Sequence, residues 1–223
     1  MSSQGTASAA SGGNDEGKAT AYRFLSRVDP VLARLVGEFG TPDPFGWIGG
    51  SRTGEGKFAA MVLHIVGQQI STAVAFVLYD RVAEAAAGEI TPASIAALDP
   101  IVLRACGLSR AKVDYVQALA EAELSGALDI ENADTCADDE VVARLTGVRG
   151  IGLWTSQMFL IHQLKRSDVL PAGDIGIRRA IERQWSLDKV PSIIDVQQRG
   201  ALWTPHRTHA AALLWASLGA APA

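Results

Sequence analysis

A glycine-punctuated turn between two helical stretches, at residues 145–152, is the sequence feature that most constrains the fold. Before the turn, the acidic residues 138–140 place negative charge where the helix dipole is positive, which predicts a helix starting there. After the turn, apolar residues recur at helical spacing from Leu153 onward. The sequence therefore predicts two consecutive helices joined by a short turn that needs glycine at Gly150 and Gly152.

This turn is a candidate anion site. Gly150 and Gly152 have no Cβ, so a bulky anion can approach the backbone, and the free amides of the second helix point toward it. A nucleic-acid phosphate is the obvious ligand. Taken alone, the glycine pair equally fits a tight turn between packed helices. A dinucleotide-binding fingerprint is disfavoured because no β-branched apolar strand precedes the glycines.

A single carboxylate follows the second helix. Residues 168–171 read Asp-Val-Leu-Pro, and residues 173–176 read Gly-Asp-Ile-Gly before another amphipathic stretch. Asp174 is therefore a good helix N-cap, and this role alone would account for an aspartate there. A capping role is compatible with a chemical one, because capping fixes the direction of the carboxylate.

Together these motifs carry a resemblance. The hairpin of residues 145–152 followed by Trp154-Thr155, and the segment 168–176, resemble the helix-hairpin-helix DNA glycosylase superfamily, within it the 3-methyladenine DNA glycosylase II branch. The resemblance implies an all-α, two-lobed helical bundle with a cleft between the lobes and the helix-hairpin-helix motif at about residues 138–165. It also implies a base excision DNA repair enzyme that flips bases, with Asp174 as the catalytic carboxylate.

The resemblance implies further site residues. The base pocket is expected to contain Trp154, Trp215, Met158 and Gln68. DNA contacts are expected from Gln69, Ser71, Arg149, Gly150, Gly152 and Thr155, with Gln69 filling the gap left by an extruded nucleotide. Main-chain oxygens of Thr146, Val148 and Ile151 are expected to hold a monovalent cation that bridges to a phosphate.

One position indicates which kind of member the chain resembles, and two positions depart from the family pattern. Relatives that also cleave the DNA backbone carry a lysine nucleophile where this chain has Trp154, so the resemblance implies a monofunctional enzyme. Gly173 replaces an aspartate that usually precedes the catalytic one. Met158 replaces an aromatic residue found in many relatives, which changes the expected width of the base pocket.

Charge and composition limit the partners. The formal net charge of −4 argues against indiscriminate nucleic-acid binding, so a local positive face is required. The candidates for that face are Arg149, Lys165, Arg166, Arg178 and Arg179. The chain has no apolar run of the ~18 residues that a membrane span needs and no basic-then-apolar leader, which predicts a cytoplasmic protein without membrane contact. A monomer is expected.

No required cofactor is expected. The two cysteines, Cys106 and Cys136, are far apart, and the four-cysteine set that holds an iron–sulfur cluster in some relatives is missing, so no such cluster is expected. His206 and His209 have i, i+3 spacing, but no third metal ligand accompanies them.

The chain divides into a tail and a core. Residues 1–18 are small, polar and glycine-rich, which predicts a disordered tail, and residues 19–223 form the glycosylase core. The additional β-rich N-terminal domain of some relatives is expected to be missing, because few residues precede the apolar helix at 58–66.

The function predicted for this core is removal of alkylated purines of the 3-methyladenine type from double-stranded DNA. A ring-methylated purine is cationic and leaves readily, which suits a site with one carboxylate that assists hydrolysis of the N-glycosidic bond. Two alternatives stay open: a non-catalytic helix-hairpin-helix DNA-binding protein, and a glycosylase for uracil, a mismatched base or an oxidised base.

Overall fold

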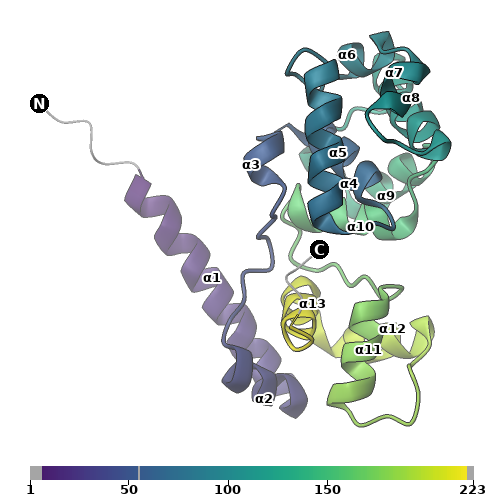
Figure 1. Cartoon of the computed structure of the whole chain (residues 1–223). Coiled ribbons are helices and arrows are strands. Elements are labelled where there is room, and N and C mark those ends of the chain that lie inside the picture. The colour runs from purple at the N-terminus through teal and green to yellow at the C-terminus, as the bar shows by residue number, and fades with distance from the viewer. Residues whose placement is uncertain (1–6, 55, 220–223) are drawn as a thin grey trace, which may run out of the picture. The chain divides into compact units, whose positions relative to one another are not determined.

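The computed structural model describes residues 7–54 and 56–219, and all regular elements within them are helices. This confirms the predicted all-α class. The chain divides into two compact units. Unit 1 comprises Met1–Gly46 and Lys165–Ala223, and unit 2 comprises Trp47–Leu164 (Figure 1). Within the described ranges, no helix is both long and apolar enough to span a lipid bilayer.

Unit 1 is a small bundle built around the last helix of the chain. Helix α13 (Arg207–Ala216) packs against α1 (Ala7–Val28), α2 (Pro30–Phe39) and α11 (Ile175–Gln184). Helix α11 also contacts α12 (Ile193–Gly200), which runs into the short 3-10 turn η2 (Ala201–Trp203). Most side chains of α13 are buried, so this apolar helix forms the core of unit 1.

Unit 2 is built around α4 (Lys57–Gly67), a helix with nearly all of its side chains buried. It contacts α3 (Gly50–Thr53), α5 (Thr72–Ala85), α8 (Arg110–Leu124) and α10 (Leu153–His162). Helices α6 (Pro92–Ala97) and α7 (Pro100–Ala105) cover α8, while η1 (Ala133–Thr135) precedes α9 (Asp138–Thr146), which packs on α10. The predicted helix–turn–helix pair is therefore α9 and α10.

The N-terminal segment differs from the expectation of a disordered tail through residue 18. Helix α1 begins at Ala7, so residues 7–18 are helical, while residues 1–6 lie outside the described part of the chain. The physical reason is continuity with an anchored helix. No proline interrupts α1, and its later turns bury Tyr22 and Leu25, so the helix extends backward from packed residues.

A buried hydrogen bond joins the start of unit 1 to its end. Asp29 Oδ1 caps α2 by accepting from Val31 N at 3.0 Å, while its Oδ2 accepts from the indole of Trp203 at 3.1 Å. Trp203 is completely buried and Asp29 nearly so. Removing the carboxylate would leave both a helix end and a buried indole N–H unsatisfied.

We therefore expect Asp29→Ala to lower the free energy of unfolding by about 2–4 kcal/mol, since a lost cap and an orphaned buried donor add together. Asp99→Ala is the matched control, because Asp99 caps α7 from an exposed position through Ile101 N at 2.7 Å. That variant should lose only about 1 kcal/mol. Urea denaturation followed by circular dichroism measures both; equal losses would contradict the role of the Trp203 bond.

Candidate active site

Asp174 is the carboxylate of the predicted site, and two donors fix its direction. It is the N-cap of α11, and its Oδ1 accepts from Ile177 N at 2.8 Å. The same oxygen accepts from the indole nitrogen of Trp215 on α13 at 3.1 Å. The capping prediction is thus confirmed, and the carboxylate is held from its own helix and from a neighbouring one.

Gly176 makes the contact between Asp174 and Trp215 possible. A Cβ added at Gly176 would lie 2.9 Å from Asp174 Oδ1 and 3.6 Å from Trp215 Cδ1. Any side chain there would displace the carboxylate or the indole. Gly173 is different, because a Cβ there would make only an ordinary contact of 3.9 Å with Ile193 Cδ1. Gly176 is part of the sequence motif, but no role was predicted for it. Its position two residues after the N-cap Asp174 is the feature that could have indicated this contact.

The loop that delivers Asp174 is tied down by the start of α13. Arg207 forms a two-pronged ion pair with Asp168, with Nε–Oδ1 at 2.8 Å and Nη2–Oδ2 at 3.0 Å. The hydroxyl of Thr208 donates to the Arg166 carbonyl at 2.7 Å and accepts from Val169 N at 2.9 Å. The ion-pair partner of Arg207 is therefore a carboxylate within the protein.

Trp215 serves the carboxylate in this structure. It was predicted as a base-pocket residue, yet only 4% of it is exposed and its N–H bonds Asp174. Met158, a second predicted pocket residue, is completely buried in α10 and has no surface for a ligand here. Trp154, at the start of α10, is 36% exposed.

The hairpin of unit 2 uses its two glycines for different reasons. Gly150 has φ +91°, and a Cβ there would lie 2.0 Å from the ring of Tyr115. Gly152 is the N-cap of α10, and a Cβ there would meet nothing within 4 Å. Gly150 is therefore required by backbone conformation and packing, whereas the bare backbone at Gly152 leaves space for a ligand.

The first turn of α10 presents main-chain donors. No side chain of the described residues caps this helix, and Gly152 and Leu153 are exposed. Uncapped amides at a helix start carry partial positive charge, so they suit a phosphate oxygen. Arg149 beside them is exposed and pairs with Asp114 at 3.3 Å, so its charge is available at the surface but partly compensated.

The turn after α4 carries Gln69, the residue predicted to fill the gap left by an extruded nucleotide. Gln69 is exposed and has the left-handed value φ +60°, which is uncommon for a residue with a side chain. Ser71 caps α5 by accepting from Val74 N at 3.4 Å, as its position before the helix predicts. Gln68, predicted in the base pocket, instead donates to the Gly150 carbonyl at 3.0 Å and to Thr155 Oγ1 at 3.4 Å.

The predicted residues therefore form two ordered groups. In unit 1 the structure brings Asp174 and Trp215 together. In unit 2 it brings Gln68, Gly150 and Thr155 together, with Gln69 adjacent in the chain. Each group is held by contacts inside its own unit, so its internal geometry is defined by that unit alone.

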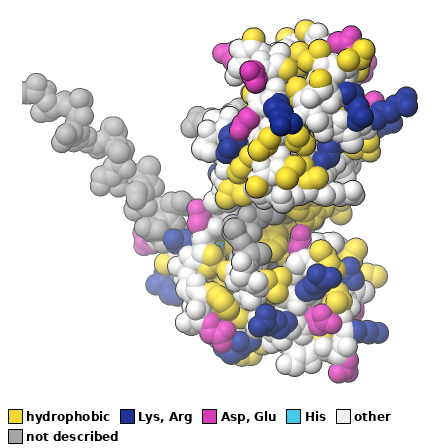
Figure 2. All heavy atoms as spheres, in the orientation of Figure 1, with side chains coloured by type: hydrophobic (Ala, Val, Ile, Leu, Met, Phe, Trp, Pro, Cys, Tyr) yellow, Lys and Arg dark blue, Asp and Glu magenta, His cyan; other side chains and the backbone are white. Residues whose placement is uncertain are grey.

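The predicted positive face contains fewer available cations than expected. Lys165 donates to the Phe45 carbonyl at 2.9 Å, and Arg178 donates to the Pro191 carbonyl at 2.9 Å. In the face shown in Figure 2, basic side chains are scattered among acidic and apolar ones.

The side chains that could bind a metal ion do not form a cluster in the described part of the chain. Within the described ranges, no group of three or more His, Cys, Asp or Glu side chains could hold a metal ion. His206 and His209 have ring centroids 5.8 Å apart, and burial lowers the pKa of His209 to about 4. At the hairpin, the carbonyl oxygen of Val148, one of the three predicted cation ligands, accepts from Ile151 N at 3.1 Å.

The structure thus contains the predicted pair of helices joined by a glycine-containing turn and, at the start of a separate helix, the predicted carboxylate, which are the features expected of a helix-hairpin-helix protein. The chain matches the model of the HhH-GPD superfamily base excision DNA repair proteins over residues 62–205. It belongs to this family, which confirms the superfamily predicted from the two motifs.

Individual relatives agree with this assignment. The chain is 34% identical over 196 residues to DNA-3-methyladenine glycosylase 1 of Schizosaccharomyces pombe, covering 86% of this chain and 83% of the relative. It is similar to the solved structure of S. pombe Mag1 in complex with abasic DNA, with a TM-score of 0.77, 32% identity, and coverage of 88% and 95%. The 3-methyladenine DNA glycosylase of Archaeoglobus fulgidus matches with a TM-score of 0.71, 25% identity, and coverage of 89% and 68%.

The two glycines give a testable separation. Gly150→Ala should destabilise unit 2 by more than about 2 kcal/mol. The new Cβ would clash with Tyr115, and alanine would have to adopt the positive φ of Gly150. Gly152→Ala should keep the native unfolding midpoint but weaken binding to duplex DNA, because its methyl group occupies the space before the α10 amides. Thermal unfolding and fluorescence-anisotropy titrations measure the two effects; unchanged DNA affinity for Gly152→Ala would contradict phosphate binding there.

Proposed function

We propose that the chain is a monofunctional DNA glycosylase that excises alkylated purines of the 3-methyladenine type from double-stranded DNA. The observation that carries the proposal is the Asp174 carboxylate, oriented by the Ile177 amide and the Trp215 indole in a member of the HhH-GPD family. The names of its relatives supply the substrate class, since several are DNA-3-methyladenine glycosylases.

In this reaction the bond between the deoxyribose C1′ and the purine nitrogen breaks, and the base leaves with the bonding electron pair. The sugar then carries oxocarbenium charge, which the Asp174 carboxylate stabilises electrostatically. A water oxygen adds to C1′, its proton passes to a base such as Asp174, and an abasic site remains. The carboxylate need not reorient for this role because both donors already hold it.

The DNA backbone stays intact in this proposal. A lyase step needs an amine that attacks C1′ and forms a Schiff base. The position of that amine in bifunctional relatives is occupied by Trp154, whose indole nitrogen cannot form a Schiff base. The product is therefore an abasic duplex with unbroken strands.

An alkylated purine suits the groups present. Methylation at a ring nitrogen gives the base a positive charge, so it leaves without much help from an acid. The exposed indole of Trp154 would attract such a cation with ~0.5–2 kcal/mol. We assign Gln69 to the gap left by the flipped nucleotide, where insertion offsets part of the lost stacking.

The duplex is held mainly through its backbone. The amides at Gly152 and Leu153 face a phosphate, and Arg149 adds a neighbouring charge. A monovalent cation held by the carbonyl oxygens of Thr146, Val148 and Ile151 would strengthen this contact by bridging to the same phosphate. The proposal requires no other cofactor. The protein is proposed to act as a monomer.

Asp174→Asn tests the chemistry. The amide oxygen still caps α11, so the fold should be kept, while the charge that stabilises the sugar cation is lost. Release of 3-methyladenine from alkylated duplex DNA should fall by at least about a hundredfold, with binding to an abasic duplex unchanged. Asp99→Asn, a capping carboxylate in unit 2, is the control and should keep full activity. Undiminished release by Asp174→Asn would refute the assignment.

A lesion panel distinguishes the alternatives. A non-catalytic DNA-binding protein would bind duplexes and release no base from alkylated, uracil-containing, mismatched or oxidised substrates. A glycosylase of another specificity would release one of the latter three and spare 3-methyladenine. Release of methylated purines alone supports the proposal.

Trp215→Phe tests the orientation of the carboxylate. It removes one of the two donors to Asp174 Oδ1 while keeping an aromatic ring in the core. The kcat for 3-methyladenine release should fall about tenfold with little change in KM, because the lost bond acts on the transition state. The control is Trp185→Phe, a half-buried indole of the same unit that packs on Trp203. A rise in KM with an unchanged kcat would instead indicate that Trp215 contacts the base.

A further inference from the structure

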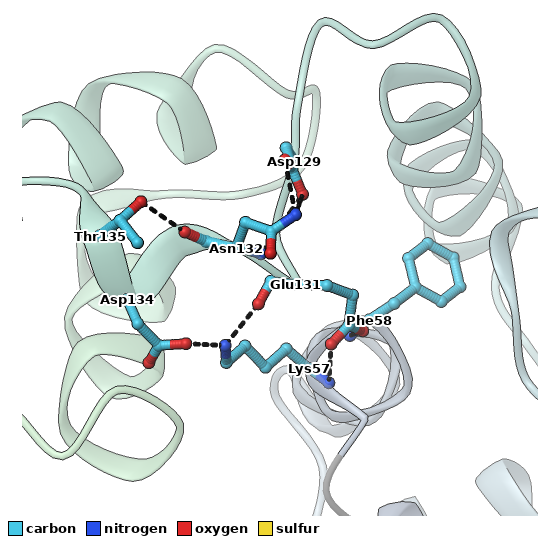
Figure 3. A network of polar contacts seen from close by, with 7 residues as sticks. All are labelled: Lys57, Phe58, Asp129, Glu131, Asn132, Asp134 and Thr135. Carbon is cyan, nitrogen blue, oxygen red and sulfur yellow. Dashed lines mark hydrogen bonds and ion pairs between the residues drawn. The ribbon is translucent and has the colours of Figure 1, made fainter.

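The turn that carries Gln69 extends from a helix that is pinned at both ends. At its start, the Glu131 carboxylate accepts from Phe58 N at 2.9 Å and from Lys57 N at 3.3 Å (Figure 3). The Lys57 ammonium donates to the Glu131 carbonyl at 2.6 Å and pairs with the Asp134 carboxylate. Two otherwise unsatisfied amides of α4 are thereby capped by a distant loop.

The other end of α4 is capped by a lysine. Lys112, in the first turn of α8, donates from its ammonium to the Val66 carbonyl at 2.7 Å. This carbonyl belongs to the last turn of α4, where carbonyl groups lack intrahelical partners and attract cations. Lys112 is half-buried, and this burial lowers its pKa. The contact is thus a specific cap that is partly shielded from water.

Beyond this cap, the turn is held from the hairpin side. The Gln68 side chain donates to the Gly150 carbonyl and to Thr155 Oγ1, 82 and 87 residues away in sequence. The next residue, Gln69, sits in the left-handed region at φ +60°. A non-glycine residue in that region is strained and persists when its surroundings hold it.

We propose that Lys112 and Gln68 are positioning residues that hold Gln69 ready for insertion into the duplex. Lys112 fixes the end of α4 before the turn, and Gln68 fixes the turn against the phosphate-binding hairpin. This inference deepens the proposed function and rests on it, because Gln69 is the side chain that fills the gap. Neither residue is required to touch the base or the sugar.

Holding the turn in advance lowers the conformational entropy that is lost when Gln69 inserts into the duplex. Ordering a backbone segment costs conformational entropy, and a mobile turn would meet this cost each time a nucleotide is extruded. A turn already held in its strained conformation meets the cost during folding, so more of the insertion energy favours the flipped state. The effect should be large where the lesion is stacked and paired, and small where it is already unpaired.

The experiment compares Lys112→Met and Gln68→Ala with wild type in single-turnover release of 3-methyladenine at saturating protein. For a lesion paired in a duplex, we expect each variant to be about tenfold slower. For the same lesion opposite an abasic site, or in a single strand, the rate should stay within about twofold. Lys112→Arg, which keeps a donor to Val66, should recover the wild-type rate. Equal slowing on paired and unpaired lesions would indicate a general structural role and overturn the proposal.

A double-mutant cycle gives a second readout. If Lys112 acts through Gln69, then Lys112→Met combined with Gln69→Ala should be no slower than Gln69→Ala alone. Additive losses would overturn the proposal. The control is Gln117→Ala, which removes a similar bond from a glutamine to the Leu98 carbonyl, 3.3 Å long, within the same unit. It should leave the ratio of paired to unpaired rates unchanged.

A binding readout separates this inference from the proposed function. 2-Aminopurine placed next to a paired 3-methyladenine reports extrusion of that base and insertion of a side chain through its fluorescence, before any bond is cleaved. If wild type releases no base but Lys112→Met still abolishes its fluorescence change, the proposed function fails and the positioning role stands. If wild type releases base and Lys112→Met gives an unchanged fluorescence signal and unchanged rates, the positioning role fails alone.

Discussion

The hydrogen bonds to Asp174 Oδ1 are the interaction on which the candidate chemistry depends. A carboxylate at the start of a helix is already directed by the helix amide, but one donor leaves rotation about its side chain. The Trp215 indole removes that freedom, and Gly176 leaves the space for both groups. The ion pair of Asp168 with Arg207 fixes the other end of the same loop, so the carboxylate is held by the fold of unit 1.

The hairpin shows how one short motif can combine structural and functional requirements. Gly150 is needed because the backbone is left-handed and the Tyr115 ring lies against it, irrespective of any ligand. Gly152 has an ordinary backbone conformation and open space, so the protein fold gives no reason to exclude a side chain there. In the proposed function, the bare backbone at Gly152 lets a phosphate approach the α10 amides closely.

Local features of the fold could be predicted from sequence because their causes are local. Caps such as Asp174, Ser71 and Ser109 bond amides two or three residues away, so the helix starts at α11, α5 and α8 are readable from the chain. The bonds from Trp215 to Asp174 and from Gln68 to Gly150 span 41 and 82 residues. No spacing rule predicts such pairs, so both residues were expected to contact the base. The helical segment 7–18 was missed because its composition is polar, while its order comes from packing farther along α1.

The long-range bond of Gln68 also has a consequence for how recognition and extrusion are linked. The turn with Gln69 and the hairpin with Gly152 belong to one unit and share a direct contact through the Gly150 carbonyl. Under the proposed function, a phosphate bound at the hairpin would therefore set the position of Gln69 relative to the DNA backbone through this contact. Asp174 is held by contacts within unit 1. Replacing Gln69 should therefore reduce the population of flipped nucleotides and leave the geometry of the Asp174 carboxylate intact.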